Sequence, residues 1–143
     1  MSFESVLRDY PGDVTFVSVQ YPDPHFKRRH HKRRIVQDDL VTQVDRVLCP
    51  GGYVFLQSDV REVLTDMRSR FEESPAFVLA TADQVSDFAA RNQVESPPRA
   101  SIFDSESGSI TFNPTGVPTE REVHASAEGE RMHRSLFRKE VVS

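Results

Sequence analysis

The chain has 143 residues, 37% of them hydrophobic and 28% charged, and a formal net charge of −4. That length indicates one domain with its own core, and no apolar run reaches the ~18–20 residues of a membrane-spanning helix. A lone cysteine excludes an internal disulfide, and we interpret Cys49 as a buried structural thiol rather than a nucleophile. The N-terminus lacks the features of a secretory signal, so we expect a soluble, intracellular protein, in nucleus, cytoplasm or plastid.

Predicted strands and helices alternate in the first half of the chain. Residues 14–20, VTFVSVQ, alternate in part and are rich in β-branched side chains, which predicts a strand. Residues 33–48 carry apolar side chains at helical spacing and predict a helix ended by the PGG of residues 50–52. Residues 53–58, YVFLQS, predict a buried strand, after which Asp59 begins a second helix with an apolar stripe up to Phe71. This order is typical of parallel βαβ construction, hence of the α/β fold class.

The second half is less regular. Residues 95–109, ESPPRASIFDSESGS, are rich in proline, serine and acid and predict a flexible surface connection without chemistry. Residues 119–128 predict a helix, and residues 132–138 a final strand. The strand at 14–20 is apolar enough to need neighbours on both sides, yet almost nothing precedes it and no Gly-rich loop follows a strand. We therefore expect a single, truncated domain over residues 1–143, incomplete on its N-terminal side.

One stretch concentrates the positive charge of this acidic chain. Residues 27–34, KRRHHKRR, hold six of the 18 lysines and arginines and directly follow YPDP. Such a run is also compatible with a nuclear localisation signal or with solvated charge. Because it leads into an amphipathic helix, and because arginine binds phosphate oxygens in a bidentate manner, we expect contact with a nucleic acid. The two histidines have no third ligand at suitable spacing, so we expect no metal site.

Carboxylates follow both early strands. In an open α/β sheet the ligand crevice lies beyond the carboxyl ends of the strands, so Asp23 and Asp59 are expected at the same edge. Each has a structural alternative: Asp23 as a turn residue, and Asp59 as a helix cap with Glu62. Likewise Thr119 and Glu122, in PTERE, match a capping box.

Three separated pieces, YPDPHFKRRHHKRR, LCPGGYVFLQSD and VPTERE, resemble the C-terminal half of the tRNA (guanine-N7)-methyltransferases in order and spacing. The resemblance covers most of the chain and implies the C-terminal part of a Rossmann-like class I methyltransferase with a mostly parallel sheet. It further implies S-adenosylmethionine as cofactor, tRNA as partner, and methylation of N7 of a guanine in the variable loop. Eukaryotic relatives also work with a β-propeller (WD-repeat) subunit. The family's Gly-rich cofactor loop has no counterpart here, so a non-catalytic tRNA-binding module is the alternative function.

The resemblance also assigns roles to single residues. Asp23 matches the catalytic aspartate and, with Thr119, is expected at the cofactor. The expected substrate and tRNA contacts are Lys27, Arg29, His30, Lys32, Arg33, Arg34, Asp59, Thr119, Glu120, Arg121 and Glu122. His25 departs from the family by replacing a tryptophan. Guanine N7 has an in-plane lone pair and no proton, so Asp23 would orient the guanine and stabilise its developing positive charge rather than act as a general base.

Overall fold

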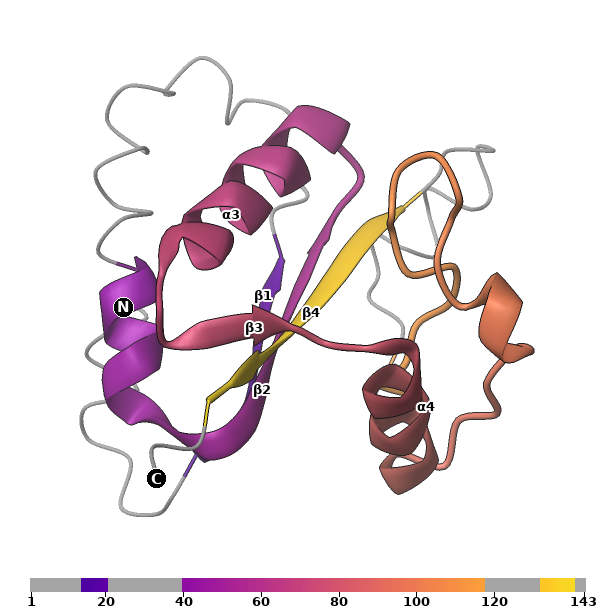
Figure 1. Ribbon diagram of the computed structural model, residues 1–143, viewed down its shortest axis with the longest axis horizontal. Helices are drawn as coiled ribbons and strands as arrows, with labels where there is room; N and C mark the ends of the chain where they lie inside the picture. Colours follow the sequence, from indigo (N-terminus) through magenta and orange to yellow (C-terminus); the bar gives the residue numbers. More distant parts are fainter. Residues whose placement is uncertain (1–13, 21–39, 118–131, 141–143) are drawn as a thin grey trace.

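The computed structural model describes residues 14–20, 40–117 and 132–140 (Figure 1). These residues form a four-stranded sheet with the order β1-β2-β4-β3. Its strands are β1 (Val14–Gln20), β2 (Leu48–Ser58), β3 (Phe77–Leu79) and β4 (His133–Lys139). β1 pairs in parallel with β2, whereas β4 runs antiparallel to both β2 and β3, so β4 alone of the four is reversed. The predicted α/β class and mostly parallel strand direction are confirmed.

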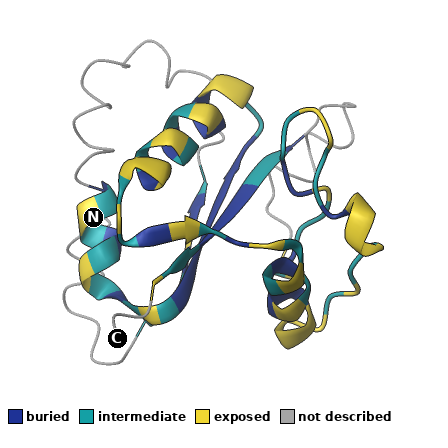
Figure 2. Ribbon diagram, viewed as in Figure 1, coloured by how far each residue is buried: buried dark blue, intermediate teal, exposed yellow. Residues whose placement is uncertain are grey.

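Helices cover both faces of the sheet (Figure 1). The helical residues 40–47 and α3 (Arg61–Glu73) pack on one face, and α4 (Ala82–Arg91) and residues 102–112 pack on the other. Successive strand side chains point to opposite faces. Hence β2 contributes Val54 and Leu56 to the core under α3, and Tyr53 and Phe55 to the core under α4. Figure 2 shows the result, a buried sheet between helices with exposed outer faces.

The start of β2 differs from the prediction. The helix expected over residues 33–48 is described only at 40–47, and β2 already begins at Leu48, so the LCPGG segment belongs to a strand. This segment bulges, because Val14 of β1 pairs with Leu48 while Phe16 pairs with Tyr53. The bulge requires glycine at residue 52, where a Cβ atom would lie 2.8 Å from the Cδ1 atom of Leu48.

Two interpretations of single residues near β2 are wrong. Cys49 is half-buried in β2, not buried at the end of a helix. α3 begins at Arg61 with Val60 as N-cap, so Asp59 is not the N-cap residue that the predicted capping box with Glu62 requires. Instead the Val60 N–H donates to the Ser58 Oγ atom at 3.0 Å, because the chain turns sharply between strand and helix. The apolar stripe of α3 is confirmed by the burial of Val63, Leu64, Met67 and Phe71.

The structure adds elements that the sequence analysis did not predict. α4 begins after a capping box in which Thr81 accepts from the Gln84 N–H at 3.2 Å and Gln84 accepts from the Thr81 N–H at 2.9 Å. Within residues 95–109 lie the short 3-10 helix η2 (Arg99–Ser101) and Ile102, which is only 1% exposed. That segment is thus anchored to the core, and its flexibility stays a prediction. The strand expected at 132–138 is confirmed as β4, while the helix expected at 119–128 lies outside the described residues.

Candidate functional site

Among the residues predicted to form the site, the structure describes Asp59. The other predicted site residues lie outside the described ranges: Asp23, Lys27, Arg29, His30, Lys32, Arg33, Arg34, Thr119, Glu120, Arg121 and Glu122. Their roles stay predictions, including the use of Asp23 and Thr119 at the cofactor. The described residues do define one edge of the sheet, where β1 ends at Gln20 and β4 begins at His133. The other predicted site residues belong to the segments that follow β1 and precede β4 in the sequence.

Asp59 lies where the carboxyl ends of two parallel strands meet. Gln20, the last residue of β1, pairs with Gln57, and β2 ends one residue later at Ser58. Asp59 follows directly, is half-buried, and has a buried Oδ1 atom. Asp59 is not the N-cap residue of α3, which is Val60. The YPDP segment follows Gln20 in the sequence and lies outside the described residues, so the expected meeting of Asp23 and Asp59 stays a prediction.

A buried polar pair supports this edge from the α4 side of the sheet. Gln57 is 1% exposed, and its Oε1 atom accepts a hydrogen bond of 2.8 Å from Nε of Arg134, its register partner on β4. The Arg134 N–H in turn donates to Ser109 Oγ at 2.8 Å. The Nε2 atom of Gln57 has no hydrogen-bond partner within the described part of the chain. Sequence reasoning missed this pair, although a glutamine at the end of the apolar run YVFLQS was a usable signal.

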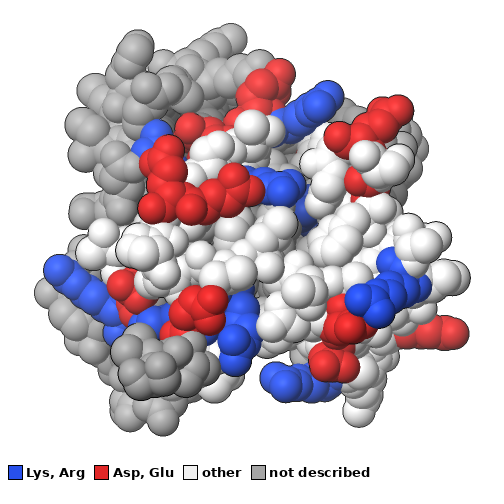
Figure 3. Space-filling view, viewed as in Figure 1, with Lys and Arg blue, Asp and Glu red and all other residues white. Residues whose placement is uncertain are grey.

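A groove of about 380 Å³ adjoins the edge on the opposite face, between α3 and the loop of residues 104–109. Figure 3 shows basic side chains beside the hollow between these two elements. The side chains from α3 include Arg61, Thr65 and Arg68, the loop contributes Ser107, and β4 contributes His133. His133 pairs in register with Ser58, which places this end of the groove at the carboxyl end of β2.

The loop wall of the groove is held by local hydrogen bonds. Asp104 Oδ1 accepts from the N–H groups of Glu106 and Ser107 at 2.8 and 3.1 Å, and the loop reverses at Gly108 with φ of 74°. Arg68 Nη1 donates to the Ser107 carbonyl at 3.5 Å, which links the loop to α3. These contacts keep the groove open as a defined surface feature.

The described residues contain no cluster of three or more metal-ligating side chains, and the two histidines of the basic run, on which the prediction of no metal site was made, lie outside these residues. Nor do the described residues fit S-adenosylmethionine on their own, because none of their glycines follows the carboxyl end of a strand to open a helix. No helix in these same ranges is long and apolar enough to cross a membrane.

Comparison with known proteins supplies the family. A family model described as "Putative methyltransferase" matches residues 4–101. The chain is 45% identical over 112 residues to a tRNA (guanine-N(7)-)-methyltransferase of Synechococcus sp., covering 78% of this chain and 37% of the relative. It is 40% identical over 120 residues to the protein of that name from Synechocystis sp., with 84% and 46% covered, and 38% identical over 136 residues to that of Microcystis aeruginosa, with 94% and 53% covered.

These matches confirm the resemblance that the three sequence motifs indicated, and the α/β sheet with helices on both faces agrees with a Rossmann-like class I methyltransferase. The chain spans between about a third and a half of the length of these curated relatives. Since the family model matches more than half of the chain, the chain belongs to the methyltransferase family that this model describes.

Proposed function

We propose that the chain acts as an S-adenosylmethionine-dependent tRNA (guanine-N7)-methyltransferase, with a guanine of the tRNA variable loop as its target. The observation that carries this proposal is the 38–45% identity to curated relatives of that name over most of the chain. The position of Asp59 supports it, because the carboxyl edge of parallel strands is where α/β folds bind their ligands.

The proposed chemistry asks for placement of the substrate more than for proton transfer. The N7 lone pair can attack a methyl group directly, so the side chains must align the base and stabilise the positive charge that develops on the purine. We assign this role to Asp23, with Asp59 and Glu122 as further carboxylates of the same site. S-adenosylmethionine would supply the methyl group, and the described residues alone do not form its binding site.

The basic run of residues 27–34 would supply affinity for the tRNA backbone. Phosphate contacts fix position and orientation without reading the base sequence, which suits a patch of lysines and arginines on an otherwise acidic chain. The names of the relatives mention tRNA, and no observation supports the predicted β-propeller subunit, so our proposal includes tRNA as the only macromolecular partner.

A methyl-transfer assay tests the proposal. The purified chain is incubated with an unmodified tRNA transcript and S-adenosylmethionine labelled on its methyl group, and the digested tRNA is analysed for N7-methylguanosine. We expect the label in N7-methylguanosine, a loss of roughly 10²-fold or more in Asp23→Asn, and no loss in Asp87→Asn, an exposed aspartate on α4. Binding of tRNA without any methyl transfer would refute the enzymatic proposal and leave a tRNA-binding module.

A further inference from the structure

The groove between α3 and the 104–109 loop has an uneven distribution of charge. At one end the Arg68 Nε atom forms an ion pair of 2.8 Å with Glu72, and Arg68 also bonds to Ser107, so this arginine is already engaged. At the other end the exposed guanidinium of Arg61 forms no ion pair with any carboxylate of the described residues. The Arg61 end of the groove is therefore the cationic end.

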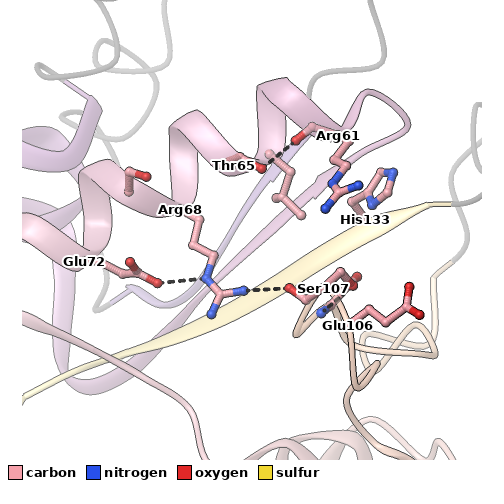
Figure 4. A pocket seen from close by; sticks show the side chains of 10 residues that line it. Arg61, Thr65, Arg68, Glu72, Glu106, Ser107 and His133 are labelled. Atoms are coloured by element: carbon pink, nitrogen blue, oxygen red, sulfur yellow. Dashed lines mark hydrogen bonds and ion pairs between the residues drawn. The ribbon is translucent and has the colours of Figure 1, made fainter.

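Figure 4 shows how the side chains at this end lie. Arg61 extends from α3 toward the imidazole of His133 at the start of β4, and both line the groove. The carboxylate of Glu106, the other acidic lining residue besides Glu72, points away from the two arginines (Figure 4). An anion at this end would thus meet a planar set of N–H donors without facing a carboxylate directly.

The cationic end also has a defined position relative to the proposed substrate site. Arg61 is the first residue of α3 and follows Asp59 by two residues, and His133 pairs with Ser58 at the end of β2. A polynucleotide whose base reaches the carboxyl edge would therefore pass its backbone close to Arg61. From Arg61 to Arg68 the groove follows about 10 Å of helix, at 1.5 Å per residue, which is enough for one or two nucleotides.

Hydroxyl groups complete the lining along the same helix. Thr65 and Ser69 follow Arg61 at spacings of four and eight residues, so they lie on the same side of α3. Thr65 donates its hydroxyl hydrogen to the Arg61 carbonyl at 2.9 Å, which leaves its oxygen lone pairs as acceptors for a ribose 2′-hydroxyl. A cation at one end and hydroxyls along the wall match a ribose-phosphate backbone.

From these contacts we propose that this groove binds a backbone phosphodiester of the tRNA, held mainly by Arg61, a residue that does not belong to the basic run of residues 27–34. The inference rests on the proposed function, since it takes tRNA as the polyanion. It adds a second anchoring point that comes from a different element of the fold and lies on the α3 face of the sheet.

The test measures the affinity of the whole chain for a fluorescent tRNA transcript by anisotropy across a salt series. Arg61→Ala should weaken binding about five- to tenfold and reduce the slope of log K against log salt by roughly 1, the contribution of one phosphate contact. Arg91→Ala, an exposed arginine in the last turn of α4, is the matched control and should leave both values within about twofold of the wild type. Arg61→Lys should keep the salt slope and lose part of the affinity.

A second pair of variants adds negative charge instead of removing positive charge. Ser69→Asp, inside the groove, should weaken tRNA binding, whereas Ala90→Asp on the exposed side of α4 should not. Melting temperatures check folding, and all these positions are exposed.

If Arg61→Ala behaves like Arg91→Ala while the wild type binds and methylates tRNA, the groove proposal is wrong and the proposed function stands. If the wild type neither binds nor methylates tRNA, both are wrong.

Discussion

The hydrogen bond between buried Gln57 and Arg134 should show a larger coupling free energy in a double-mutant cycle than a contact on the surface. Gln57 is 1% exposed, and the 2.8 Å bond from Arg134 Nε is charge-assisted. In Arg134→Leu the Oε1 atom of Gln57 stays buried without this donor, which should lower the free energy of unfolding by about 1.5–3 kcal/mol. In Gln57→Leu the acceptor and the Nε2 group disappear together, while the half-exposed Arg134 keeps access to water. We therefore expect a smaller loss there, of about 0.5–1.5 kcal/mol.

The double variant separates this explanation from simple loss of packing. With leucine at both positions no buried polar atom of the pair remains, so the combined loss should fall short of the sum of the two single losses by at least ~1 kcal/mol. Urea unfolding followed by far-ultraviolet circular dichroism measures all four proteins, with equal m-values required for the comparison. In melting temperature, 1 kcal/mol corresponds to about 3–5 °C for a chain of this size.

A surface ion pair supplies the control for this cycle. Arg99 and Asp83 lie 3.5 Å apart, with side chains 75% and 69% exposed, and their coupling should stay below ~0.5 kcal/mol. Losses that simply add for Gln57 and Arg134, within about 0.5 kcal/mol, would show that their hydrogen bond contributes nothing special and would refute the reasoning.

Two further predictions concern the core and the sheet margin. Phe71→Ala should lower the free energy of unfolding by about 3–5 kcal/mol, because this ring is 1% exposed and its centroid lies 5.1 Å from that of Phe77. A loss under ~1.5 kcal/mol in urea unfolding would contradict close packing of this ring. Lys139→Met should cost about 1–3 kcal/mol, since its ammonium donates to the Leu48 carbonyl at 2.8 Å and pairs with Asp45 Oδ1 at 3.1 Å. Arg138 lies 4.0 Å from Glu140, so Arg138→Met should change the free energy of unfolding by less than ~0.5 kcal/mol. Equal effects of the two substitutions would contradict a specific role for Lys139.

Local patterns were sufficient for the elements whose burial follows one clear period. The β-branched residues of β1 and the i, i+3, i+4 stripe of α3 were predictable because each buries one side of a regular element. α4 carried the same kind of signal, a T-x-x-Q capping box followed by Val85, Phe88 and Ala89 at helical spacing, and could have been predicted from it.

The LCPGG segment shows where local signals fail. Proline and glycine normally end an element, and they favoured a helix stop at residues 50–52. In the structure the pairing of Val14 with Leu48 extends β2 backward, and the glycines allow the bulge that this pairing needs. Tertiary pairing therefore overrides the local preference, and it cannot be read from a window of five residues.

The same distinction applies to the candidate site, where some features follow from the order of elements and others depend on contacts between distant residues. The rule that parallel strands carry ligands at their carboxyl ends was enough to select Asp59, because it requires only the order of elements. The groove and the buried polar pair both required contacts between distant parts of the chain, since Arg68 and Ser107 are 39 positions apart and Gln57 and Arg134 are 77 apart.

A slip of β4 by one residue would move every one of its side chains to the other face of the sheet. Arg134 would no longer contact Gln57, and His133 would no longer lie beside Arg61 at the cationic end of the groove. The register that satisfies a buried glutamine on one face thus also places the cationic end of the groove on the other, so stability of the sheet edge and tRNA affinity at Arg61 should fall together in variants that disturb β4.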